Sequence, residues 1–139
     1  MTASAISLDH ALNSFDDEWS PRIVTRVNDY DVRVVKIRGE FMWHRHLDTD
    51  EFFHVLHGEV DIAMRDADGS EHVVHLRQGS VFTVPRGVEH KPQSLQGASM
   101  LLFEPSGTVN TGDQEGKLLP AHIQSTTGQP LADDGAVGE

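Results

Sequence analysis

The residues of this chain best suited to chemistry begin with two histidines separated by one position, His44 and His46. On a β-strand, residues i and i+2 point to the same face, so both imidazoles would project in one direction. A four-residue loop then leads to Glu51, which we expect to lie opposite His46 across a hairpin. Two imidazoles and a carboxylate on one face can share a divalent metal ion.

A third imidazole, His90, follows a sharp turn that contains Pro85 and Gly87. Three neutral imidazoles and one carboxylate suit several divalent transition metals. We predict one divalent ion per chain, Fe, Zn, Mn or Ni, with the ligands His44, His46, Glu51 and His90. An H-x-H pair alone is weak support for a metal site, since exposed strand histidines are ordinary. On an octahedral ion, these four ligands would leave two adjacent places open for a substrate or water.

Three apolar side chains are candidates to line a substrate cavity beside the predicted ligands. Met42 shares the strand parity of the two histidines, Phe53 shares that of Glu51, and Met64 lies on the apolar face of an alternating segment. Core packing explains the same positions equally well. If they do line a cavity, the substrate has an apolar or aromatic part. No catalytic acid or base is identified from the sequence.

Four further histidines do not form a second predicted metal site. His54 lies on the strand face opposite Glu51, and His57 precedes a turn glycine. His72 and His75 differ in strand parity, so their side chains should point to opposite faces.

Short β-rich runs separated by turn residues must position the candidate ligands. The predicted strands are 22–27, 30–37, 40–46, 51–56, 59–65, 71–76, 80–84, 88–93 and 99–104. Many short strands joined by tight turns favour an all-β fold, a small barrel or double-sheet jelly roll, which limits exposed strand edges.

The two ends of the chain differ from this β-rich middle. Leu8, Leu12, Phe15 and Trp19 are spaced by four, three and four residues, which predicts a short amphipathic helix within 6–19. We therefore divide the chain into an N-terminal helix and lead-in, a barrel and a C-terminal extension. Their predicted ranges are 1–21, 22–105 and 106–139. The extension is rich in Gly, Thr, Ser, Asp and Pro, and we expect it to be loosely ordered beyond about residue 125.

Composition excludes several classes of function. The 139 residues include 22 Asp and Glu against 11 Lys and Arg, a net charge of −11, so nucleic acids and anionic membranes are unsuitable partners. The absence of cysteine excludes disulfides, thiolate metal sites and cysteine nucleophiles. No apolar run approaches the roughly 18–20 residues of a membrane span, and the N-terminus does not resemble a signal peptide. We expect a cytoplasmic protein with a small-molecule ligand.

The candidate ligands and their flanking glycines resemble the two motifs of the cupin family. The first motif, G-x5-H-x-H-x3,4-E-x6-G, corresponds here to Gly39, His44, His46, Glu51 and Gly58. The second, G-x5-P-x-G-x2-H-x3-N, corresponds to Gly79, Pro85, Gly87, His90 and Ser94. Gly39 is one residue closer to His44 than the motif specifies, and Ser94 replaces the family asparagine. Neither departure affects a ligand position.

The resemblance implies a double-sheet cupin barrel with one metal ion near its centre, and a homodimer formed through outer strands. Cupins include isomerases, cyclases, lyases, dioxygenases, storage proteins and sensors, so the fold alone does not specify a reaction. We expect a metal-dependent enzyme that uses Lewis-acid chemistry of the isomerase, cyclase or lyase type. The alternatives are an Fe(II)-dependent dioxygenase and a non-enzymatic module that binds a small molecule or senses a metal.

Overall fold

The structure is a computed structural model that describes residues 4–131 of the chain. Its helices and strands run in the order α1 (Leu8–Asn13), β1 (Arg22–Val27), β2 (Tyr30–Glu40), β3 (Glu51–His57), β4 (Val60–Arg65), β5 (Glu71–Leu76), β6 (Val81–Val84), β7 (Glu89–Pro105), the 3₁₀ helix η1 (Gly112–Gln114) and β8 (Gln129–Pro130). The all-β prediction with one short N-terminal helix is confirmed.

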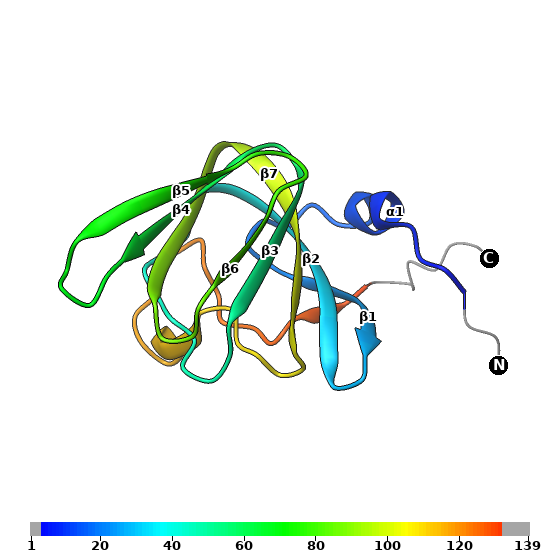
Figure 1. Cartoon of the computed structure of the whole chain (residues 1–139). Helices are drawn as coiled ribbons and strands as arrows, with labels where there is room; N and C mark the ends of the chain where they lie inside the picture. The colour runs from blue at the N-terminus through cyan, green and yellow to red at the C-terminus, as the bar shows by residue number, and fades with distance from the viewer. Residues whose placement is uncertain (1–3, 132–139) are drawn as a thin grey trace.

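The strands form one curved sheet in the order β5-β4-β7-β2-β1-β8, with β3 pairing to both β6 and β7. The 17-residue strand β7 pairs with three other strands, β2, β3 and β4. These pairings curl the sheet into a barrel, and α1 packs on the outside of the barrel (Figure 1). The tips of β4 and β5 extend away from the barrel as a hairpin (Figure 1).

Two of the predicted strands, 88–93 and 99–104, form a single strand, β7. The turn-like residues between them make a bulge instead of a chain reversal. Ile37 pairs with Ala98 and Gly39 pairs with Ser94, so the register between β2 and β7 shifts at this point. Gly97 has a φ of +95°, and the Arg38 side chain donates to the carbonyl of Gln96. The bulge keeps the strand continuous while bending it.

The predicted strand 40–46 is not a regular strand beyond the end of β2. In this segment, His44 forms an isolated bridge with His90. Phe41 N–H donates to the carbonyl of Pro92, and the carbonyl of His46 accepts from Gly87 N–H. These contacts are irregularly spaced, so the segment follows the beginning of β7 without forming a continuous ladder.

Alternation along the strands places the core as predicted. Glu51, Phe53 and Val55 are the buried residues of β3, and Val60, Ile62 and Met64 are those of β4. The main apolar cluster fills the barrel. A second cluster joins α1 to the outer face of β1 and β2, and consists of Ala11, Leu12, Phe15, Val24 and Val34.

The predicted helix within 6–19 is shorter than its apolar spacing suggested. It begins after Ser7, whose side chain accepts from His10 N–H, and ends at Asn13. Trp19 lies beyond it with a φ of +59°. Its backbone N–H donates to the carbonyl of Lys36 and its indole N–H to the carbonyl of Arg38. These two bonds to β2 hold Trp19 against the barrel, so it cannot continue the helical stripe.

The described part of the C-terminal extension folds back onto the barrel. Ile123 is buried in the main apolar cluster, and Gln129–Pro130 pairs in parallel with β1. Gly112 packs so closely on the carbonyl of Arg45 that a Cβ atom there would overlap it. We expected a loosely ordered tail beyond about residue 125. Part of that tail, 132–139, lies outside the described residues.

Among the helices of residues 4–131, none is long and apolar enough to cross a membrane.

A fully buried arginine on β2 links the barrel to the returning chain. Arg33 donates from Nε and Nη2 to Asp31, at 3.1 and 2.9 Å, and from Nη1 to the carbonyl of Thr108. Nη1 also lies 3.3 Å from a carboxylate oxygen of Glu104. Ser106 donates its hydroxyl to Asp31. Burying these charges is tolerable because each has a partner.

We expect Asp31→Ala to lower the free energy of unfolding by about 3–5 kcal/mol, since it removes the main partner of a buried guanidinium. Urea unfolding of the metal-free protein measures the change. Asp16→Ala is the matched control, because Asp16 is exposed, and it should alter stability by less than about 0.5 kcal/mol. Equal stability of the two variants would contradict a structural role for the Asp31–Arg33 pair.

Candidate metal centre

Backbone pairing brings the first two imidazoles of the site together. His44 and His90 exchange both of their backbone hydrogen bonds, at 3.1 and 2.9 Å. They are therefore directly opposite each other in an antiparallel bridge, with side chains on the same side. Their ring centroids lie 4.3 Å apart. The turn after β6 thus positions His90 by pairing it with the segment that carries His44.

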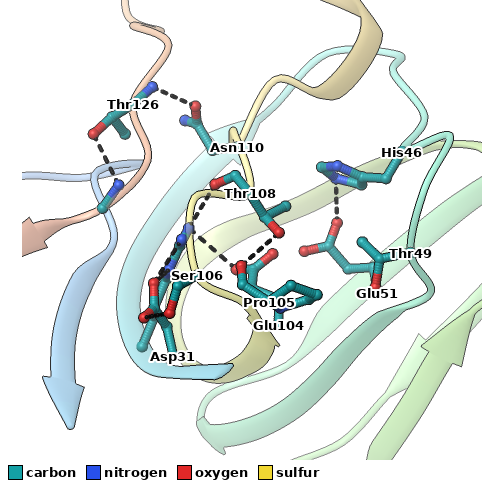
Figure 2. Close-up of polar contacts among 12 residues, drawn as sticks. Asp31, His46, Thr49, Glu51, Glu104, Pro105, Ser106, Thr108, Asn110 and Thr126 are labelled. Atoms are coloured by element: carbon teal, nitrogen blue, oxygen red, sulfur yellow. Dashed lines mark hydrogen bonds and ion pairs between the residues drawn. The ribbon is translucent and has the colours of Figure 1, made fainter. Parts of the chain in front are cut away.

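The hairpin predicted to place Glu51 opposite His46 does not form. Glu51 pairs with Val84 of β6, whereas the backbone of His46 is bonded to Gly87. Glu51 nevertheless points inward as the first residue of β3, and its Oε1 lies 2.5 Å from Nε2 of His46 (Figure 2). The two side chains meet in the barrel interior, although only Glu51 lies on a strand.

The four predicted ligands converge on one place. One potential ligand atom from each of His44, His46, Glu51 and His90 lies within 4.8 Å of the others, and all four side chains are buried. Within residues 4–131, this is the one group of three or more metal-ligating side chains that converges in this way. His54, His57, His72 and His75 form no second group. His75 instead contacts Asp61 and Glu59 on the surface.

The histidine tautomers suit a cation at this place. Nδ1 of His44 lies 2.9 Å from the carbonyl of Met42, and Nδ1 of His90 lies 3.0 Å from that of Val88. A carbonyl only accepts, so both Nδ1 atoms carry the proton and each Nε2 presents a lone pair. The buried Nε2 atoms of His46 and His90 face Oε1 of Glu51, at 2.5 and 3.5 Å, without a hydrogen bond of regular geometry. Nitrogens placed in this way beside a carboxylate are what a bound divalent ion would satisfy.

The site's electrostatics favour a neutral His44 and an ionised Glu51, with His46 as the imidazole that holds its proton against that carboxylate. Burial, reinforced by the charge of His90, lowers the pKa of His44 to about 3. Burial would raise the pKa of Glu51, but its contacts with His46 and His90 hold that pKa well below its ordinary value. Burial likewise opposes protonation of His46, and Glu51 outweighs it to raise the pKa of His46.

A second buried carboxyl, Glu104, lies beside Glu51 and was not identified from the sequence. Figure 2 shows it between Glu51 and the polar group around Asp31. Burial and the negative charge of Glu51 raise the pKa of Glu104 well above its ordinary value, against the effect of Arg33. The sequence does carry a signal for Glu104. It continues the alternation of inward-facing apolar residues at the end of its strand, so its side chain should also point inward.

A cavity adjoins the four-residue group and is lined mainly by apolar side chains. Its polar end is formed by His44, Glu51 and Glu104. Of the three predicted lining residues, Phe53 lies on the cavity wall. Met64 is buried in the core, where it pairs with His90 across the sheet, and Met42 packs against that core from outside. Trp19, Pro21 and Asn110 also line the cavity, and sequence reasoning assigned them no such role.

A family model described as "Cupin domain" matches residues 32–104 of the chain. These residues include all four members of the candidate metal group.

Two solved structures and one curated protein illustrate the similarity. A cupin-2 domain containing protein from Shewanella frigidimarina is 39% identical, with a TM-score of 0.68 over 73% of this chain and 94% of that one. Protein NMB1881 from Neisseria meningitidis is 30% identical, with a TM-score of 0.63 over 74% of this chain and 100% of its own. Protein YdbB of Bacillus subtilis is 35% identical over 51% of this chain, and the match spans 59% of its length.

The pKa shifts predict distinct titrations for two of the imidazoles. In the metal-free protein, His44 should stay neutral between about pH 5 and 8, the range in which an ordinary imidazole titrates. His46 should keep its proton to higher pH than an ordinary histidine, and Glu51→Gln should lower its pKa by removing the neighbouring charge. NMR titration of the assigned ring protons measures both effects. A His44 ring that titrates within this range would contradict the burial argument.

Proposed function

The chain belongs to the cupin family, and we propose that it binds one divalent metal ion through His44, His46, Glu51 and His90 and acts as an enzyme on a small organic substrate. The observation that carries the proposal is the buried convergence of three imidazoles and one carboxylate, in which Nε2 of His46 and of His90 both face Oε1 of Glu51. Without an ion, Nε2 of His90 would stay without a good hydrogen bond, at a cost of about 1–3 kcal/mol.

When bound, the ion would supply Lewis-acid chemistry, polarising a carbonyl or enol oxygen or lowering the pKa of a bound water. The protein's own contribution begins with orientation. The carbonyls of Met42 and Val88 hold the rings of His44 and His90 with Nε2 directed inward. Such contacts behind the ligands fix both tautomer and ring angle. Isomerase, cyclase and lyase reactions all proceed from an enolised or polarised substrate of this kind.

The cavity wall is mainly apolar, so it offers few groups for proton transfer. Glu51 is a proposed ligand, so it is not also assigned as the base. Glu104 is the ionisable side chain of the cavity wall that lies outside the ligand set, within the described residues. We assign proton transfer to its carboxyl, which Arg33 holds in place from behind.

The three-histidine and one-carboxylate donor set also suits iron(II). With that ion, the same site would support a dioxygenase, so the metal that the protein carries distinguishes the two enzymatic alternatives. The third alternative is a non-enzymatic module that binds its ligand without turnover.

The first test is elemental analysis of untagged protein purified without a metal-affinity column and then reconstituted anaerobically. We expect about one divalent ion per chain in the wild type, because the four donors form a single site. His90→Ala and Glu51→Gln should each abolish stoichiometric binding. His75→Ala is the control, since His75 is exposed and lies outside the group, and it should keep the metal.

Full metal retention in both ligand variants would overturn the ligand assignment, and a wild type that takes up no metal would overturn the proposed function. Near-stoichiometric iron directs activity assays to oxygen consumption and supports the dioxygenase alternative. Zinc or manganese directs them to isomerase, cyclase and lyase substrates and supports the Lewis-acid proposal. Tight ligand binding without turnover of any substrate supports the binding module.

A further inference from the structure

The segment that carries His44 and His46 lies outside the regular strands and is held from two sides. On one side, His44 exchanges both backbone hydrogen bonds with His90, and the carbonyl of His46 accepts from Gly87 N–H. Successive residues of an extended segment direct their N–H and C=O groups to opposite sides. The backbone groups of Arg45, between the two proposed ligands, therefore face away from the barrel and need a different partner.

Asp113, from the returning C-terminal segment, supplies that partner to both backbone groups of Arg45. Its backbone N–H donates to the carbonyl of Arg45 at 2.9 Å, and its Oδ1 accepts from Arg45 N–H at 3.1 Å. Its Oδ2 accepts from Nε of Arg45 at 3.2 Å. One residue thus takes the place of a neighbouring strand, which would otherwise complete the pairing of this segment.

Gly112, the residue before Asp113, packs directly on the same segment. A Cβ atom on Gly112 would overlap the carbonyl oxygen of Arg45 and would lie 3.3 Å from Nδ1 of His46. His46, Gly112 and Asp113 also line one surface depression beside the 47–49 loop. The returning segment is therefore part of the boundary between His46 and the solvent.

Residues 108–126, the strap, reach this position through a few contacts at their ends. The carbonyl of Thr108 accepts from the buried Arg33. Asn110 N–H donates to the carbonyl of Thr126, and Thr126 N–H donates to Oδ1 of Asn110 (Figure 2). Ile123 is buried in the main apolar cluster, while most other strap residues are exposed or half-buried. Because the strap lacks the continuous ladders of the barrel strands, it should detach at a lower free energy than the barrel unfolds.

The strap follows residues 32–104, the region that the cupin family model matches. All four proposed ligands lie within that region. The contact between Asp113 and Arg45 is therefore added to the metal group by the C-terminal extension of this chain.

We propose that Asp113 positions His44 and His46 for the metal ion, so that docking of the strap and metal binding stabilise each other. Asp113 is a positioning residue, because it contacts Arg45 and does not belong to the ligand set. A docked strap fixes the backbone that carries two imidazoles, and a bound ion fixes the same imidazoles at their Nε2 atoms. By linkage, each event favours the other by the same factor. The proposal rests on the proposed metal function and makes the strap a regulator of that site's affinity.

Zinc affinity, measured by competition with a chromophoric chelator, provides the first test. Asp113→Ala should weaken zinc binding about tenfold, the lower end of the effect of removing groups that orient metal ligands. Asp113→Asn should weaken it by less, because the amide oxygen still accepts from Arg45 N–H. Gly112→Ala should weaken it at least as much as Asp113→Ala, since the added Cβ atom displaces the strap from Arg45.

Glu115→Ala is the matched control. Glu115 is an exposed strap residue that does not share the hydrogen bonds of Asp113 to Arg45, and its replacement removes the same charge. This variant should bind zinc as the wild type does. If the two alanine variants weaken binding equally, the effect comes from the lost negative charge and the positioning role is overturned.

Urea unfolding separates positioning from a purely structural role. If Asp113 positions the ligands, Asp113→Ala lowers the free energy of unfolding more in the zinc-loaded protein than in the metal-free protein. A role in packing alone would lower both values equally, and that result would overturn the proposal.

Hydrogen exchange of the wild type tests the reciprocal effect and needs no variant to fold. Zinc should slow exchange of the Asp113 and Thr126 amides about tenfold, the same factor as in the affinity test. The Asp66 amide, bonded to Ser70 at the tip of the β4–β5 hairpin, should be unaffected because it is remote from the strap.

Unchanged exchange of the strap amides on zinc binding would overturn the coupling. A wild type that binds zinc at the four-residue group without either effect overturns this inference alone. A wild type that takes up no zinc overturns the proposed function.

Discussion

The backbone bridge between His44 and His90 is the contact on which the rest of the site depends. It joins the irregular segment after β2 to the first residues of β7. The ring centroids of the two candidate ligands lie 4.3 Å apart as a result. Because β7 also pairs with β2, β3 and β4, any residue bridged to its beginning is held against the whole barrel. The turn that carries His90 also holds His46, through Gly87 N–H, whereas Glu51 is positioned by its pairing with Val84 of β6.

Around this bridge, the interior holds more buried carboxyl groups than fully buried cationic side chains. Asp31, Glu51 and Glu104 are buried, and Arg33 is the fully buried guanidinium among them. Arg33 with Arg26 balances Asp31 and part of Glu104. The carboxylate that remains, Glu51, lies 2.5 Å from Nε2 of His46 and 3.5 Å from Nε2 of His90, and it raises the pKa of His46. A divalent ion would replace the proton that His46 otherwise holds against Glu51, which is the physical reason that the proposed metal fits the site.

The segments that flank the barrel contribute to the cavity wall. Trp19 enters from the N-terminal side through a left-handed backbone conformation, and Asn110 comes from the returning C-terminal segment, whose Ile123 packs in the main apolar cluster. Gly112 allows that segment to approach the backbone of Arg45, one residue from His46. The barrel strands thus supply the metal group and most of the cavity wall, and the flanking segments complete that wall.

Local pattern is sufficient to predict part of this protein. Alternation predicted the inward faces of β3 and β4, and the order of His44, His46, Glu51 and His90 predicted a metal-type group. How these residues meet depends on tertiary contacts, because strand parity specifies which face a side chain occupies but not which strand lies beside it. That is why Glu51 was predicted opposite His46 although it pairs with Val84. It is also why the buried Arg33 cluster, Glu104 and the wall role of Trp19 were missed: each depends on contacts between residues far apart in the chain, which the packing of the whole barrel selects.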